Sequence, residues 1–458
     1  MHDHQGIIGR SVWGVALGLA AWFAWSAGAS AQEGAAPAPA SPPPAASAPA
    51  PETPAAPPTL EEKGRYLATA GDCISCHTRP GGEPFSGGLA LKTPFGTLYT
   101  PNITPDKDTG IGNWTEEQFG RAMHSGVDDD GDQLYPVFPY TAYTKVTDED
   151  VHAIFAYFKS LKPVSYTPPK NDMKFPYNIR ALLLGWKKLY FHEGRYTPDP
   201  SQSAEWNRGA YLVQGLAHCG TCHTPRNSLG GEDMSMAFTG GTYIDEIRDV
   251  VEDQQITPQE GMFRPWSSVN LTTAPSGIGN WSLDEIVQYL KTGHTNYAGA
   301  FGPMSEVVNN STKYLTDADL HAMAVYLKSL PAKAAPVDKI PDDKIKAGEI
   351  VYTTRCGDCH LPTGLGIAPG PNVDPTKVSP PLVGNAIIQA PDPASLINVI
   401  LYGAHEANLG QGSWPKMPGF QNEVGFDDDQ IAALCDYLRA SWGNQGGPVT
   451  AAQVTKQR

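Results

Sequence analysis

Cysteine is scarce in this chain, and almost all of it is used in one pattern. Only seven of the 458 residues are cysteine, and six of these form three pairs, each followed directly by histidine. A framework of disulfides is therefore not needed to account for the cysteines. The seventh cysteine, Cys435, lies in the apolar run 431–438, so we expect a buried, inert thiol.

Long apolar runs and positive charge are also in short supply. The one long apolar run, 12–27, follows Arg10 and precedes Ala29-Ser-Ala31, a pattern typical of a cleaved secretory signal peptide; an uncleaved anchor is the competing interpretation. We therefore expect export to the periplasm, and we expect no other stretch to span a bilayer. The 33 Lys and Arg residues face 48 Asp and Glu residues, and the formal charge of −15 argues against nucleic acid as a partner.

The cysteine pairs all have the form C-x-x-C-H. In such a motif the two thiols can each form a thioether to the porphyrin, and the histidine supplies an axial nitrogen to the iron. A redox dithiol does not need that histidine, and a zinc site pairs its motifs at short range, whereas these lie 146 and 137 residues apart (219 − 73 and 356 − 219). The sequence predicts three covalently bound c-type hemes, attached through Cys73, Cys76 and His77, through Cys219, Cys222 and His223, and through Cys356, Cys359 and His360.

The sequence around the motifs repeats as well. Asn102-Ile-Thr and Gly110-Ile-Gly-Asn-Trp114 return as Asn270-Leu-Thr and Gly277-Ile-Gly-Asn-Trp281, and helical patterns come before and after each loop. The repeat predicts three copies of one small all-α domain. The boundaries we expect are 1–31 for the signal peptide, 32–58 for an Ala/Pro-rich linker, and 59–200, 201–335 and 336–458 for the three domains.

One stretch, 171–200, has no counterpart in the other two copies. It contains Trp186-Lys-Lys-Leu-Tyr-Phe191, which mixes basic and apolar residues. It is either an amphipathic contact toward a membrane or a partner, or packing between domains.

An electron-carrying heme usually keeps a second protein ligand, and a Met thioether raises the reduction potential. Met417, in Lys416-Met-Pro-Gly-Phe420, and Met304, in Phe301-Gly-Pro-Met304, stand in loops between a motif and the last helix of a copy. We predict both as axial ligands. Packing in the core is the alternative for either side chain.

The first copy departs from this pattern. Phe138 stands where a ligand is expected, and a phenyl ring cannot bind iron. Met123, His124 and Met173 are the candidates for the sixth ligand, and an open iron is the remaining alternative.

These features together resemble the triheme cytochrome c subunits of periplasmic, membrane-associated dehydrogenases, of the type found in acetic acid bacteria. The resemblance covers nearly all of the chain after residue 58 and rests on the three motifs, the repeated loops, Leu134-Tyr-Pro136, Phe301–Met304 and Met417–Phe420. It implies three tandem class I cytochrome c-like domains. It also implies transfer of electrons from a catalytic dehydrogenase subunit to membrane ubiquinone.

The residue at position 138 distinguishes two types of partner within this family. Subunits that serve alcohol dehydrogenases containing pyrroloquinoline quinone typically carry Met-Pro-Tyr where this chain has Phe138-Pro-Tyr140. The departure resembles cytochromes that serve molybdenum and iron–sulfur aldehyde dehydrogenases, so we expect such a partner, with a small iron–sulfur subunit. The alternatives are the alcohol dehydrogenase, a free-standing periplasmic electron shuttle, and a heme peroxidase that uses an open iron.

Overall fold

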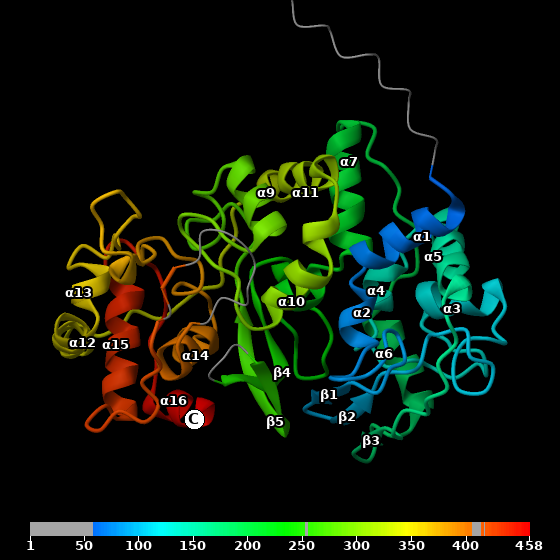
Figure 1. Cartoon of the computed structure of the whole chain (residues 1–458), viewed down its shortest axis with the longest axis horizontal. Helices are drawn as coiled ribbons and strands as arrows, with labels where there is room; N and C mark the ends of the chain where they lie inside the picture. Colours follow the sequence, from blue (N-terminus) through cyan, green and yellow to red (C-terminus); the bar gives the residue numbers. More distant parts are fainter. Residues whose placement is uncertain (1–57, 252–254, 405–413, 416) are drawn as a thin grey trace, which may run out of the picture. The chain divides into compact units, whose positions relative to one another are not determined.

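A pair of crossing helices recurs three times along the chain. In the computed structural model, α1 (Leu60–Ala70) packs across α5 (Asp148–Ser160), α7 (Ala204–Tyr211) across α11 (Asp317–Ser329), and α12 (Asp342–Arg355) across α15 (Asp428–Ala440) (Figure 1). We call the stretches 59–200, 201–335 and 336–458 the first, second and third segments. Each segment contains one such pair and one C-x-x-C-H motif.

A glycine makes each crossing close. Gly64, Gly209 and Gly348 stand at equivalent places in the first helix of each pair. A Cβ atom at any of them would overlap the carbonyl oxygen of an alanine in the second helix of the pair, which is Ala153, Ala322 or Ala433. The backbones therefore meet where a side chain has no room, and this threefold recurrence supports three copies of one helical unit.

The structure describes residues 58–251, 255–404, 414–415 and 417–458, and side chains outside 246–262. The expected signal peptide and all but the last residue of the expected linker lie outside the described residues. Among the described residues, every helix is too short or too polar to cross a bilayer.

Several of the helices begin at a residue whose side chain caps them. Thr115 accepts a hydrogen bond from the Gln118 amide and Gln118 reciprocates, which starts α3 (Glu116–Ser125). Equivalent capping boxes start α1 at Thr59, α9 (Leu283–Thr292) at Ser282 and α15 at Asp427.

Further elements lie between the crossing helices or follow them. In the first segment these are α2 (Cys73–Cys76), β1 (Ala90–Thr93), β2 (Gly96–Tyr99), α4 (Tyr140–Tyr143), β3 (Asp172–Met173), η1 (Arg180–Leu182) and α6 (Leu183–Tyr190). In the second they are η2 (Leu212–Leu216), α8 (Gly220–His223), η3 (Met234–Met236), β4 (Gly241–Val251), β5 (Gln255–Ser268), α10 (Pro303–Asn310) and η4 (Thr312–Tyr314). In the third they are α13 (Gly357–His360), η5 (Pro375–Lys377), α14 (Ala394–Tyr402) and α16 (Ala451–Gln457).

Two small antiparallel sheets interrupt an otherwise helical fold. One has the order β1-β2-β3, and the other is the hairpin β4–β5, in which Gly241 pairs with Ser268. The expectation of an all-α class holds for the fold as a whole, since the sheets lie in loops of helical units. The hairpin was not expected from the sequence.

The second segment contains a π-helix directly before its heme motif. From the crossing glycine to the first motif cysteine there are nine residues in the first segment (73 − 64) and ten in the second (219 − 209). The turn η2 is a π-helix, which absorbs one extra residue without ending the helix. Both motifs therefore follow their helices at corresponding places.

The first two segments share a single hydrophobic core. One cluster of buried side chains joins Leu67 and Phe158 of the first segment to Leu212 and Leu327 of the second. The third segment has a core of its own, built around Tyr352 and Leu438 among others.

Two hydrogen bonds cross between the first two segments in opposite directions. The Tyr66 hydroxyl donates to the Asp319 carboxylate at 2.6 Å, and the Tyr211 hydroxyl donates to the Asp150 carboxylate at 2.5 Å. Each tyrosine lies in the first helix of its segment's crossing pair, and each aspartate lies in the second helix of the other segment's pair. The two bonds are therefore reciprocal, and each segment provides one donor and one acceptor.

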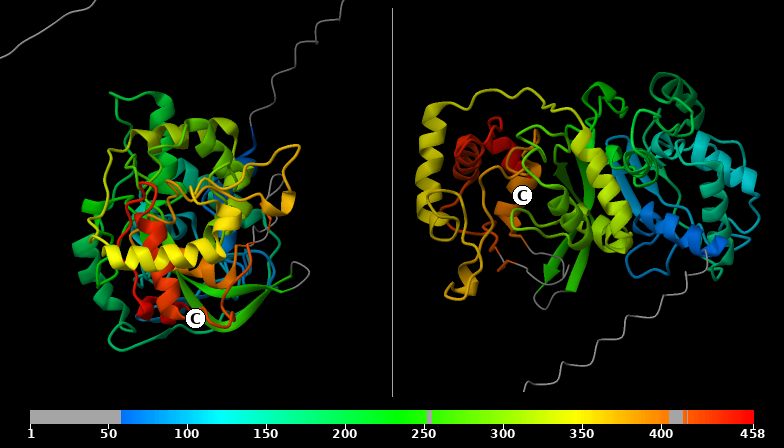
Figure 2. Two further views of the ribbon diagram at one scale, coloured as in Figure 1. Left: turned by 90° about the vertical axis from the view of Figure 1, so that its left-hand side faces the viewer. Right: turned by 90° about the horizontal axis from the view of Figure 1, so that it is seen from above.

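The third segment contacts the second through polar groups of the β4–β5 hairpin. The Ser267 amide donates to the Ser395 hydroxyl at 2.8 Å, and the Ser395 amide donates to the Ser267 hydroxyl at 3.0 Å. Asn398 of α14 donates to the carbonyl of Pro265 at 2.9 Å. Figure 2 shows the hairpin beside the third segment from two further directions.

Candidate heme sites

Each motif histidine is held through one ring nitrogen. The Nδ1 atom lies within hydrogen-bond distance of a backbone carbonyl that belongs to the loop after the motif, and this leaves Nε2 available for a metal. The distances from Nδ1 to the carbonyl oxygen are 2.8 Å for His77 and Pro101, 2.8 Å for His223 and Val269, and 3.2 Å for His360 and Pro380. The same arrangement therefore recurs at all three motifs.

The repeated asparagine explains how two of these carbonyls are placed. Pro101 and Val269 directly precede Asn102 and Asn270, both of which are almost fully buried. Each asparagine amide donates to the carbonyl of a residue that follows the second helix of the crossing pair, at 2.8 Å from Asn102 to Val164 and 2.7 Å from Asn270 to Lys333. The acceptor carbonyls were missed in the sequence, although the repeat of Asn-x-Thr marked their position.

Burial keeps the motif histidines neutral. It lowers the pKa of His77, His223 and His360 below the ordinary value, against the opposing effect of each carbonyl. A neutral imidazole is the form that binds iron. The lowered pKa and the free Nε2 of each histidine therefore both favour binding to iron.

Five of the six motif thiols differ in pKa from redox-active cysteines. All are free, and burial raises the pKa of Cys73, Cys76 and Cys219 to about 12, and of Cys222 and Cys356 to about 11. A redox or nucleophilic cysteine has a lowered pKa instead. These unpaired thiols, together with a histidine whose Nε2 is free, fit a covalently attached heme.

Met417 and Met304 are half-buried, but only Met417 lies in the expected type of loop. The backbone of Met417 bridges to Ala404, whereas Met304 is the second residue of helix α10. The loop placement expected for Met304 is therefore wrong, because Pro303 starts a helix there. Its side chain packs against the shared core of the first two segments, and the axial role of both methionines stays a prediction.

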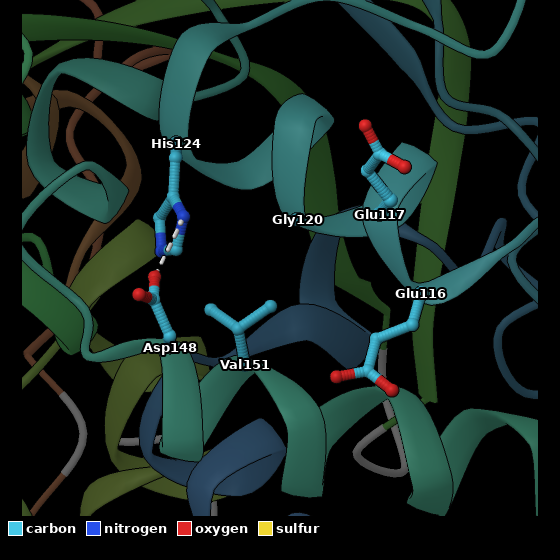
Figure 3. A pocket seen from close by; sticks show the side chains of 6 residues that line it. All are labelled: Glu116, Glu117, Gly120, His124, Asp148 and Val151. Carbon is cyan, nitrogen blue, oxygen red and sulfur yellow. Dashed lines mark ion pairs between the residues drawn. The ribbon is translucent and has the colours of Figure 1, made fainter.

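In the first segment, the structure leaves neither nitrogen of His124 free. Nε2 lies 2.9 Å from the Val146 carbonyl, and Nδ1 lies 3.5 Å from Asp148, in a hollow lined by Glu116 and Glu117 among others (Figure 3). Both nitrogens are engaged by the protein. The geometry therefore argues against His124 as the sixth ligand.

The other candidates of the first segment have structural partners as well. Met123 is buried in the shared core, and Met173 forms part of β3, paired with Gly96. Phe138 packs against Tyr143, with ring centroids 5.3 Å apart. Either methionine as ligand, or an open iron, stays a prediction for this heme.

The first and second motifs are neighbours in space. Asn310, at the end of α10, donates to the Ser75 hydroxyl inside the first motif at 2.9 Å. The Cys222 thiol is close enough to add to the effect of burial on the pKa of Cys76. The helix that carries Met304 thus contacts the first motif, and the residues that would hold two hemes are brought close together.

Comparison with known proteins agrees with this interpretation of the sites. The cytochrome c family model matches residues 61–162 and 345–442. The chain is 38% identical over 427 residues to the fructose dehydrogenase cytochrome subunit of Gluconobacter japonicus, covering 86% of this chain and 82% of that protein. It is 37% identical over 428 residues to the alcohol dehydrogenase (quinone) cytochrome c subunit of Gluconacetobacter polyoxogenes, covering 87% and 84%.

A third relative is larger. The chain is 40% identical over 409 residues to a nicotinate dehydrogenase subunit of Pseudomonas putida, covering 86% of this chain but only 32% of that protein. With relatives of this identity and coverage, the chain belongs to the family of cytochrome c subunits of dehydrogenase complexes. It is an electron-transfer subunit that carries covalently bound heme c.

Proposed function

We propose that this chain carries three hemes and passes electrons from the catalytic subunit of a periplasmic, membrane-associated dehydrogenase to ubiquinone. The observation that carries the proposal is the repeated site: three C-x-x-C-H motifs whose histidines are all held through Nδ1 by a backbone carbonyl. The heme, when bound, supplies an iron that takes up and releases one electron at a time. A signal-peptide pattern supports export to the periplasm.

The protein contributes orientation and a fixed environment. The carbonyl of Pro101 or Val269 accepts a hydrogen bond from Nδ1–H, which fixes the imidazole ring and makes Nε2 a better ligand for iron. The buried asparagine beside each carbonyl holds the loop in place. Rigid ligands move little when the charge on a metal changes, so electron transfer meets a low barrier.

For the catalytic partner, we propose a molybdenum-containing aldehyde dehydrogenase with a small iron–sulfur subunit. The names of the three relatives above differ in substrate, being fructose, alcohol and nicotinate, so they do not choose one. Phe138, which stands where the alcohol type has methionine, supports the aldehyde type. The alternative is a quinone-dependent alcohol dehydrogenase, supported by the alcohol dehydrogenase relative, 84% of which this chain covers.

One preparation tests the proposal. The complex is purified from native membranes, its other cofactors are identified, and the heme spectrum is followed after addition of acetaldehyde or ethanol. Molybdenum, iron–sulfur clusters and reduction by acetaldehyde are expected. Pyrroloquinoline quinone and reduction by ethanol would establish the alcohol type instead, and a chain that purifies alone and is reduced by neither would refute the fixed-subunit proposal.

The heme count has a separate test. The mass of the purified chain is expected to exceed that of the polypeptide by three hemes. Changing Cys356 and Cys359 to alanine is expected to remove one heme and leave two, whereas Cys435→Ala leaves three. A mass that shows two hemes in the parent chain would contradict the triheme assignment.

A further inference from the structure

The stretch that has no counterpart in the other segments exposes large apolar side chains. These lie between Phe175 and Leu189, and one neighbour from the second segment joins them. The exposed fractions are 79% for Phe175, 43% for Ile179, 56% for Leu182, 58% for Leu184, 65% for Leu189 and 51% for Leu229. We call these six side chains the apolar face.

Helix α6 is anchored by its inner side. Trp186, Lys187 and Tyr190 lie on this side, at the spacing expected of one helix face. The buried Lys187 ammonium donates to the carbonyls of Ser125 and Gly126 at 2.6 and 2.8 Å and to the Gln133 side chain at 2.6 Å. The stretch is therefore not a loose loop, and its apolar residues are not simply packing between segments.

The outer side of α6 reverses the usual pattern of a surface helix. Leu184 and Lys188 are four residues apart and Leu189 is next to them, and all three are exposed. A helix on a protein surface normally places polar residues there. Leucine beside lysine on an exposed side is typical of a helix that lies in a membrane interface.

The residues before α6 and the neighbouring loop are also fixed. Arg180 forms ion pairs with Asp128 at 2.7 Å and Asp132 at 3.2 Å. The Trp186 indole nitrogen donates to the carbonyl of Leu229 at 3.0 Å, which ties that loop to the helix. These ion pairs and this hydrogen bond therefore fix the backbone that carries the apolar face.

The charge of this stretch opposes that of the rest of the chain. Residues 170–190 contain five basic residues and one acidic residue. Arg180 is paired with two aspartates and Lys187 is buried, so the exposed charges are three lysines and Asp172, a net of +2 (3 − 1) in a chain of −15. Lys170, Lys174 and Lys188 are exposed and are not among the residues that anchor α6. Lysine is depleted in protein–protein interfaces, whereas lysine beside apolar side chains matches an anionic lipid surface.

We propose that the apolar face, with Lys174 and Lys188, docks the chain on the interfacial zone of an anionic bilayer. The apolar side chains enter the boundary between headgroups and acyl chains, and the ammonium groups contact the lipid phosphates. The inference rests on the membrane association in the proposed function and adds the surface responsible for it. It brings the first segment, rather than the third, against the membrane.

The test is flotation of the full heme-loaded chain with vesicles. Vesicles of phosphatidylglycerol and phosphatidylethanolamine are compared with vesicles of phosphatidylcholine, at low and high salt. The double variant Leu184→Glu/Leu189→Glu is expected to lose at least about tenfold in partitioning to the anionic vesicles. Lys174→Gln/Lys188→Gln is expected to lose about fivefold for each lysine at low salt and nothing on phosphatidylcholine.

The matched control is Ile350→Glu/Leu365→Glu in the third segment. These side chains are 68% and 60% exposed and lie outside the apolar face, so partitioning is expected to stay at the parent level. Unchanged heme spectra and melting temperatures show that each variant is folded. Equal loss in the control would refute the assignment of the apolar face.

The outcomes separate this inference from the proposed function. If the Leu184→Glu/Leu189→Glu chain floats like the parent but no longer co-purifies with the catalytic subunit, the apolar face is a protein interface and the inference is wrong. If neither property changes, the inference is also wrong. In either case, reduction of the hemes by substrate in the parent complex still tests the proposed function independently.

Discussion

Replacing a glycine at a helix crossing with alanine is expected to lower the free energy of unfolding, whereas the same change in a helix interior usually raises it. In a helix interior, alanine is ordinarily favoured over glycine by about 0.5–1 kcal/mol. At Gly64, however, the new Cβ overlaps the carbonyl oxygen of Ala153 and comes to 2.8 Å from the Cβ of Tyr157. The two helices must separate, and overpacking of this kind costs about 1–3 kcal/mol or more.

The net expectation for Gly64→Ala is a loss of about 1–2 kcal/mol in the free energy of unfolding. The assay is urea unfolding of the heme-loaded chain, followed by helical circular dichroism and by heme absorbance. Gly209→Ala and Gly348→Ala are expected to behave in the same way, because their Cβ atoms meet the same obstacle.

Gly120 provides the matched control for these variants. It also lies inside a helix, α3, but a Cβ there meets only Val151, at 3.9 Å. Gly120→Ala is therefore expected to gain about 0.5–1 kcal/mol from helix propensity. If Gly64→Ala gains stability as Gly120→Ala does, the backbone contact does not limit the crossing and the reasoning is refuted.

Three further predictions concern single side chains. Met304→Ala is expected to lower the reduction potential of one heme, by on the order of 0.1 V within the ~0.8 V range that axial ligands span, in a redox titration; three unchanged potentials would exclude Met304 as a ligand. Asp319→Asn is expected to cost about 2–3 kcal/mol at neutral pH, because Arg208 and Tyr66 lose a charged acceptor. Burial raises the pKa of Asp319, but these hydrogen bonds outweigh burial and place the pKa of the folded state below the ordinary value. The stabilisation is therefore present above the ordinary pKa and is lost as pH falls through the pKa of the folded state. If the stability of parent and variant depended on pH with the same slope below about pH 4, this prediction would be contradicted. Cys435 is fully buried and is expected to react with iodoacetamide only after unfolding, and mass spectrometry showing modification of the native chain would contradict its burial.

The heme motifs and the capped helix starts depend on information that is local in the sequence. A C-x-x-C-H motif indicates heme attachment from five consecutive residues. Thr115 and Gln118 form a complete capping box within four residues. Burial of Cys435 followed from its apolar neighbours and is confirmed. Such features need no knowledge of distant parts of the chain.

Features that depend on distant contacts were not predictable. Tyr66 and Asp319 are 253 residues apart, and neither residue type indicates the other. The β4–β5 hairpin lacks a clean apolar alternation, since Asp245-Glu246 and two prolines, Pro258 and Pro265, interrupt it. The sixth ligand of the first heme depends on which side chain the surrounding fold brings to the iron.

The extra residue of the π-helix was predictable from the sequence, but its effect on the helix was not. Counting from Gly209 to Cys219 and comparing with Gly64 to Cys73 shows the insertion in the sequence itself. Whether the helix ends, bends or widens to hold that residue depends on packing. The structure shows that it widens, in η2.

The shared core has a consequence for how the chain unfolds. Because the first two segments bury one common cluster and exchange the Tyr66–Asp319 and Tyr211–Asp150 bonds, neither can melt without exposing apolar surface of the other. The third segment, with its separate core and polar contacts, can melt alone. A chain with three repeats thus has two cooperative folding units, and a fragment ending at residue 200 would lack half of the core that holds its own heme motif.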